Sequence, residues 1–144
     1  MNLAEFANLT DAQIPAPPAF PEGWYMAVIS GPWLERKAGD KTIAQFPIRL
    51  TAPLPDVDQQ ALAKVQGWNT RTLFVEFWLP DDGYRLTRHF FGKVLGLDPS
   101  TTLSERAAAA EGRTLKVQLK QKARRDPDDD RIDTVVGRTL PAEA

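Results

Sequence analysis

Hydrophobic and polar residues alternate along several segments of this chain, and a period of two indicates strands that bury one face. In residues 71–80, the clearest of these segments, Leu73, Val75, Phe77 and Leu79 share one face. Phe74, Glu76 and Trp78 share the opposite face. Turn residues separate this segment from others of the same kind, so the chain is predicted to be mainly β. The predicted strands cover residues 24–30, 42–51, 71–80, 113–123 and 131–136.

Two helices are predicted between the third and fourth strands. Leu86, Phe90 and Val94 recur every four residues, which is typical of an amphipathic helix that buries one side. A second helix is expected to begin after Thr102, which has a glutamate three residues later, as in a capping box. A further helical turn is expected inside the long connection at residues 52–70.

Two local features refine the strand prediction. Residues 35–41 are polar and contain Gly39 and Asp40, so we expect a turn there. Pro47 lies on the polar side of the second strand and cannot donate a backbone hydrogen bond. We therefore expect the second strand to lie at a sheet edge or to contain a bulge.

The order of these elements is that of a five-stranded, OB-like Greek-key barrel with a helix after the third strand. A generic α+β sandwich is the structural alternative. Four prolines in residues 14–21 predict an extended N-terminal arm, because proline removes backbone donors and fixes φ. We divide the chain into an arm (1–22), an OB-like domain (23–140) and a short tail (141–144).

Composition narrows the functional classes. The 144 residues suit one domain, and the absence of cysteine excludes disulfides and thiolate metal sites. No apolar run reaches the roughly 20 residues that span a bilayer, and the N-terminus lacks the pattern of a signal peptide. A cytoplasmic protein without membrane association is therefore expected.

Catalytic chemistry finds little support in the sequence. His89 is the one histidine, and it falls beside Arg85 and Arg88 on the polar face of the predicted helix. A histidine acts as a base only with a positioned partner, so a solvated side chain is the simpler interpretation. The acidic run at residues 128–130 lacks the ligand spacing of a calcium loop. We predict no enzyme activity, no cofactor and no metal.

Charge is segregated along the chain even though the net charge is only −1. Lys116, Lys120 and Lys122 share one face of the fourth strand, and Arg124 and Arg125 continue this basic row into the next turn. A row of this kind is typical of contacts with a phosphate backbone. The alternative is a solvated outer sheet face, where lysines also prevent edge-to-edge aggregation.

Aromatic residues strengthen the nucleic-acid interpretation, because single-strand binders stack bases on aromatic rings within a positive groove. Phe74 and Trp78 are candidates if their face is open, and they belong to the core if the helix covers it. Trp33 is a second candidate because it stands near two cations. The remaining candidate phosphate contacts are Arg36, Lys37 and Arg49.

Three segments carry a resemblance to a known family. They are Pro21-Glu-Gly-Trp-Tyr-Met-Ala-Val-Ile, Phe46-Pro-Ile-Arg-Leu and Glu111-Gly-Arg-Thr-Leu-Lys-Val-Gln-Leu-Lys, which follow an acidic, proline-containing arm. In this order the chain resembles small phage-encoded proteins, long described as a domain of unknown function, that are regarded as OB-fold single-stranded DNA-binding proteins. The resemblance implies a role in phage replication or recombination, and it implies the host cytoplasm as the compartment if a phage encodes the protein.

The sequence therefore predicts sequence-independent binding and protection of single-stranded DNA. Replication or recombination proteins are candidate partners, and a homo-oligomer is compatible with the sequence. The alternative is a structural or protein-interaction module, such as a phage assembly or virion component, that does not bind nucleic acid. The proline-rich arm and the small net charge favour that alternative.

Overall fold

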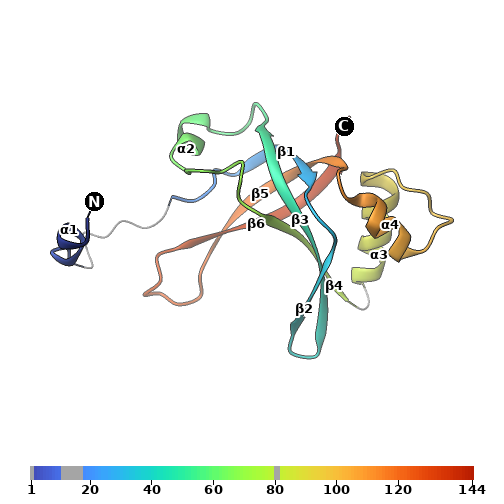
Figure 1. Ribbon diagram of the computed structural model, residues 1–144, viewed down its shortest axis with the longest axis horizontal. Helices are drawn as coiled ribbons and strands as arrows, with labels where there is room; N and C mark the ends of the chain where they lie inside the picture. Colours follow the sequence, from blue (N-terminus) through green and yellow to red (C-terminus); the bar gives the residue numbers. More distant parts are fainter. Residues whose placement is uncertain (1, 11–17, 80–81) are drawn as a thin grey trace.

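The computed structural model describes residues 2–10, 18–79 and 82–144, and it is mainly β, as predicted (Figure 1). Six strands form one antiparallel sheet in the order β2-β3-β1-β5-β6, and β4 also pairs with β3. The strands are β1 (Gly23–Ile29), β2 (Leu34–Ala38), β3 (Lys41–Pro53), β4 (Leu73–Leu79), β5 (Thr114–Ala123) and β6 (Ile132–Pro141).

The helices lie mostly between β4 and β5, as the sequence predicts. The helices between β4 and β5 group beside one end of the sheet in Figure 1, whereas α1 stands apart from the sheet within the predicted arm. None of the helices in the described ranges is long and apolar enough to cross a membrane. The helices are α1 (Leu3–Ala7), α2 (Gln59–Ala63), α3 (Asp82–His89), the π-helix η2 (Phe90–Val94) and α4 (Leu103–Ala110).

The core is built from the alternating faces of the strands. Phe46 and Ile48 of β3 are fully buried, as are Leu115, Val117 and Leu119 of β5. The aromatic rings of β3, β4 and η2 pack together at centroid distances of 5.2–5.9 Å. Burying these apolar faces stabilises the sheet at roughly 25 cal/mol per Å² removed from water.

The sheet has six strands rather than five because residues 34–38 form a strand that the sequence prediction assigned to a turn. β2 pairs with β3 from Leu34 opposite Gln45 to Ala38 opposite Lys41. Its residues are almost all exposed, so no hydrophobic alternation marks it. The turn itself is confined to two residues, and Gly39 adopts the positive φ of 64° that a tight hairpin needs.

Of the two alternatives predicted for the second strand, the sheet edge was wrong, whereas β3 does contain a register shift, where Met26 pairs with Ala52 and Ala27 with Leu50. β3 pairs on both sides, and Pro47 lies opposite Phe74 of β4. On its other side the neighbouring strand is interrupted, because β1 ends its pairing at Ile48 and β2 begins at Gln45. Ser30 donates its N–H to the Pro47 carbonyl at 2.9 Å within this interruption. The missing donor of the proline therefore falls where no regular strand pairing is required.

The first predicted helix changes its winding at Phe90. The Leu95 N–H donates to the Phe90 carbonyl at 3.0 Å, which is the i to i+5 bond of a π-helix. The wider turn rotates the buried stripe, so Phe90, Phe91 and Val94 are buried while Leu86 is 47% exposed. Leu86 was expected on the buried stripe, and that part of the prediction was wrong.

The N-terminal segment is attached to the core where it enters β1. Phe20 is 4% exposed, and the buried hydroxyl of Tyr25 donates to the Pro21 carbonyl at 2.7 Å. In contrast, Leu3 and Phe6 of α1 are exposed. Residues 11–17 of the predicted arm, which include half of the proline-rich stretch 14–21, lie outside the described residues.

Candidate nucleic-acid interface

A groove runs along the seam where the outer edges of β4 and β6 approach each other. Three adjoining hollows of about 260, 450 and 360 Å³ form it, and neighbouring hollows share lining residues. Residues 71–78 line one side and residues 131–140 line the other, and we call this feature the β4–β6 groove. No strand pairing closes this seam among the described residues, so the sheet is open here.

The outer face of β4 supplies aromatic rings to this groove. Phe74 and Trp78 both line its central hollow, and the side chain of Trp78 is 52% exposed. The helices do not cover this face, because Phe90 of η2 packs against Phe46 and Phe77 on the opposite face, at 5.2 and 5.3 Å. The two rings proposed to stack bases are therefore accessible, Trp78 more so than the half-buried Phe74.

Trp33 occupies a different environment from the one expected. It is half-buried, and its ring packs at 5.7 Å from Phe46 and 6.3 Å from Phe91. These contacts attach it to the aromatic core rather than to the β4–β6 groove. Of the four tryptophans, Trp78 is the one whose side chain is exposed.

The basic row of β5 divides into two parts. Lys120 lies opposite Val135 in the register, and Val135 lines the central hollow of the groove. Lys122 is the next outward residue towards the hairpin tip, opposite Asp133. Lys116 lies towards the other end of the strand, where its ammonium group contacts the carbonyl oxygen of Ala144. The row is thus continuous in sequence but only its second half adjoins the groove.

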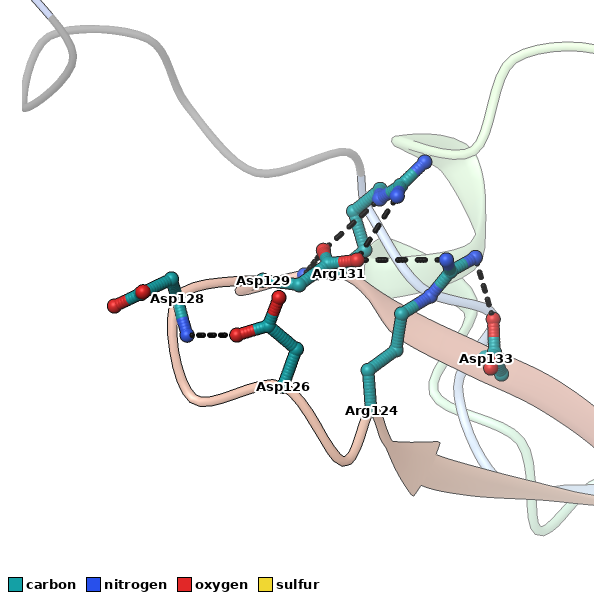
Figure 2. A network of polar contacts seen from close by, with 6 residues as sticks. All are labelled: Arg124, Asp126, Asp128, Asp129, Arg131 and Asp133. Atoms are coloured by element: carbon teal, nitrogen blue, oxygen red, sulfur yellow. Dashed lines mark hydrogen bonds and ion pairs between the residues drawn. The ribbon is translucent and has the colours of Figure 1, made fainter.

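The tip of the β5–β6 hairpin holds its charges in a network of its own (Figure 2). Arg124 pairs with Asp129 at 3.4 Å and with Asp133 at 3.0 Å, and Arg131 pairs with Asp129 at 2.9 Å. Hydrogen bonds from Arg131 hold the pKa of the Asp129 carboxyl well below its usual range. The charge of Arg124, a predicted phosphate contact, is therefore largely compensated within the hairpin.

Other cations of the same region keep their charge uncompensated. Lys120, Lys122 and Arg125 form no ion pair with any residue in the described part of the chain. All three side chains belong to exposed residues. A phosphate that approaches them from solvent does not have to displace a carboxylate first.

The remaining predicted cations are separated by the fold. Arg36 points to the same face as Trp78, since both lie opposite Ile43 in the register, and it pairs with Glu76 at 3.0 Å. Lys37 is the next residue of the strand and points to the opposite face. There it pairs with Glu35 at 3.0 Å.

Arg49 lies away from the groove. It is on the half of β3 that pairs with β1, opposite Val28, and it lines a separate hollow with Asn69 and Thr70. Sequence spacing alone grouped Arg49 with the cations of the β2–β3 region. The structure brings Arg36 to the groove side and leaves Lys37 and Arg49 elsewhere.

The groove also contains residues that the sequence analysis did not select. Arg71 lines one end, with its guanidinium 5.8 Å from the centre of the Phe20 ring, and Arg131 lines the same end. Arg138 lines the third hollow, together with Val75 and Phe77 of the inner face of β4 and with His89, which the sequence analysis considered only as a catalytic base. No sequence signal identifies these residues, because only tertiary structure places β6 beside β4. Within the described ranges, no three acidic or histidine side chains gather closely enough to hold a metal ion.

Comparison with known proteins does not extend this description. No protein-family model matches the chain, and none of the curated proteins is significantly similar to it.

Proposed function

We propose that this protein binds and protects single-stranded DNA, independently of sequence, along the β4–β6 groove. The observation that carries the proposal is that two accessible rings, Phe74 and Trp78, line a groove against β6, and that β6 pairs with the strand that carries the uncompensated ammonium groups of Lys120 and Lys122. Aromatic platforms beside a positive groove are the common design of proteins that bind single strands without sequence preference.

We further propose that the sheet is an OB-like barrel that is open at the β4–β6 seam. If β1 and β2 are taken as one interrupted first strand, the order of strands and the helix after β4 follow the OB pattern. In that fold, oligonucleotides bind on the face of the second and third strands, between the first and the last hairpin loops. Those positions correspond here to β3, β4, the β2–β3 hairpin and the β5–β6 hairpin.

The two sides of the groove suggest how a strand lies in it. Bases stack on the β4 side, where each stacked base contributes about 1–3 kcal/mol. Phosphates follow the β6 side, where Lys120, Lys122 and Arg125, on the adjacent strand β5 and its hairpin, release counterions. Three such contacts give a slope of about −2 in log K against log salt, since each contributes about 0.7 on a single strand. A duplex hides its base faces and therefore loses the stacking contribution.

The test is a titration of the full chain with a labelled oligonucleotide of mixed sequence, as a single strand and as a duplex. We expect the single strand to bind more tightly than the duplex, with an affinity that falls about 10-fold or more between about 50 and 200 mM salt. Absence of single-strand binding at the lower salt concentration contradicts the proposal. A role in phage replication or recombination, with partners from those processes, rests on the resemblance of the three sequence segments.

One observation favours the alternative function of a protein-interaction module. Leu3 and Phe6 on α1 are 82% and 51% exposed, although both are large apolar side chains. Exposed apolar residues of this kind are typical of contacts with other proteins. If interaction is the main function, replacing both residues with serine abolishes a fixed oligomer or complex, while single-stranded DNA binding is absent in both forms of the protein.

A further inference from the structure

A carboxylate stands in the middle of the proposed stacking face. Glu76 lies between Phe74 and Trp78 on β4 and lines the central hollow of the groove. Its Oε2 atom accepts a hydrogen bond from Arg36 at 3.0 Å and another from Gln45 at 2.7 Å. Gln45 comes from the adjacent strand β3, and Arg36 reaches across β3 from β2, so the carboxylate is held in place from one side.

The other oxygen of this carboxylate retains its capacity to accept hydrogen bonds. Both bonds of Glu76 to Arg36 and Gln45 end on Oε2, and Oε1 accepts none from the side chains in the described ranges. The side chain is 33% exposed, so a ligand in the groove can reach it. A fixed acceptor between two aromatic platforms is therefore available to a bound strand.

The chemistry of this acceptor excludes the DNA backbone as its partner. A carboxylate repels phosphates, and the Arg36 guanidinium reduces that repulsion without supplying a donor on the side of Oε1. Bases do supply donors, because cytosine, adenine and guanine carry an exocyclic amino group on the base-pairing edge. Thymine carries a carbonyl oxygen at the position where cytosine has its amino group, and two acceptors facing each other repel. Its N3–H donor lies between two carbonyl oxygens, and both of them repel a carboxylate that approaches this donor.

The geometry of the strand brings such an edge to the carboxylate. Residues two apart on a strand lie about 7 Å apart on the same face. A base stacked on Trp78 or on Phe74 therefore has Glu76 beside its edge. Carboxylates accept hydrogen bonds from the cytosine amino group in other protein–DNA interfaces.

We propose that Glu76 gives the groove a preference for bases that carry an exocyclic amino group over thymine. This inference rests on the proposed function, since it assigns a base-selecting residue within the same groove. It predicts a bias in base composition at one stacked position, which is compatible with binding that requires no fixed sequence motif.

The test compares oligonucleotides of deoxycytidine, deoxyuridine and deoxythymidine of equal length at slightly alkaline pH, where cytosine is unprotonated. Deoxycytidine and deoxyuridine differ mainly in the amino group, so stacking is closely matched. We expect the deoxycytidine strand to bind at least about 10-fold more tightly than either of the others, the size of one hydrogen bond to a charged acceptor. Oligonucleotides of N4,N4-dimethyldeoxycytidine, which lack the donor, bind like deoxyuridine.

The protein variants are Glu76→Gln and, as a matched control, Glu35→Gln on the opposite face of β2. Glu76→Gln is expected to bring the affinity ratio of deoxycytidine to deoxyuridine close to one, while Glu35→Gln leaves the ratio unchanged. Equal affinities of the unmodified protein for the deoxycytidine and deoxyuridine oligonucleotides overturn this inference and leave the proposed function standing. No binding to any strand overturns the proposed function itself. The dimethylated oligonucleotide keeps the inference testable if Glu76→Gln does not fold.

Discussion

The two faces of β4 carry the same kinds of side chain in opposite environments. On the inner face, Phe77 packs 5.9 Å from Phe46 and 5.3 Å from Phe90. On the outer face, Trp78 makes none of the ring contacts found among the described residues, and it is 52% exposed. The ring of Phe77 therefore stabilises the core, whereas the ring of the adjacent Trp78 is accessible to a ligand.

Replacement of an inner ring tests the structural half of this comparison and has the largest expected effect. Phe46 is fully buried and packs on several other rings of the core. We expect Phe46→Ala to lower the free energy of unfolding by about 3–5 kcal/mol, because it leaves a cavity. Urea denaturation measures this loss, and Phe46→Leu is expected to lose less. A loss below about 1 kcal/mol for Phe46→Ala contradicts the assignment of these rings to the core.

Replacement of the outer ring tests the binding half. We expect Trp78→Ala to weaken single-stranded DNA binding by about 1–3 kcal/mol, or roughly 5- to 150-fold, because one stacking platform is lost. Its effect on the free energy of unfolding is expected to stay below about 1 kcal/mol. Tyr84→Ala is the matched control, since Tyr84 is an equally exposed aromatic, at 53%, on α3. Equal affinities of the two variants contradict the assignment of Trp78 to the site.

Removal of the buried Tyr25 hydroxyl is expected to lower the free energy of unfolding less than removal of the Phe46 ring. Tyr25 is fully buried and donates its hydroxyl proton to the Pro21 carbonyl. Tyr25→Phe removes this donor, so we expect the free energy of unfolding to fall by about 1–2 kcal/mol. Chemical denaturation at neutral pH measures this loss.

The same residue gives the stability of the protein a dependence on alkaline pH. Burial, together with the nearby charge of Asp56, raises the pKa of Tyr25 to about 12. In the unfolded chain the pKa of tyrosine is about 10, so deprotonation favours the unfolded state between about pH 10 and 12. The contribution of Tyr25 is therefore complete below pH 10 and is lost as the pH rises towards 12. The Tyr25→Phe variant is expected to lose less stability over this interval, and an identical loss contradicts the role of Tyr25.

Replacement of single lysines of β5 is expected to have the smallest effect on single-stranded DNA binding. It distinguishes the half of the basic row that adjoins the groove from the half that does not. We expect the salt slope of single-stranded DNA binding to fall by about 0.7 for Lys120→Gln, because one counterion is released per phosphate contact. Lys122→Gln is expected to act alike. Lys116→Gln is the control, since this side chain contacts the C-terminal residue at the other end of the strand. A change in slope for Lys116→Gln as large as for Lys120→Gln contradicts the division of the row.

Local patterns in the sequence predict much of the fold. The alternation in β3, β4 and β5 identifies their buried faces, and the Thr102 side chain caps α4 as its spacing predicts. β2 was missed because both of its faces are polar and solvated, so its pairing with β3 leaves no periodic signal. The π-helix at Phe90 was missed because its winding depends on packing and not on residue type.

The candidate site was predictable only in part. Period-two spacing placed Trp78 and Glu76 on one face of β4, but whether that face was open depended on where the helix packs. The sequence also grouped Arg36 with Lys37, although adjacent residues of a strand point to opposite faces. Arg71, Arg131 and Arg138 escaped prediction because the approach of β6 to β4 is a long-range feature of the fold.

The most direct test of the account follows the indole N–H signals of the four tryptophans by heteronuclear NMR during a titration with a mixed-sequence single-stranded oligonucleotide. Trp78→Phe assigns the signal of the outer ring. The account predicts that the Trp78 signal shifts most and saturates with the binding curve, whereas the signals of the half-buried Trp24, Trp33 and Trp68 shift less. An unchanged Trp78 signal at saturation, or a larger shift at Trp33, contradicts binding on the outer face of β4.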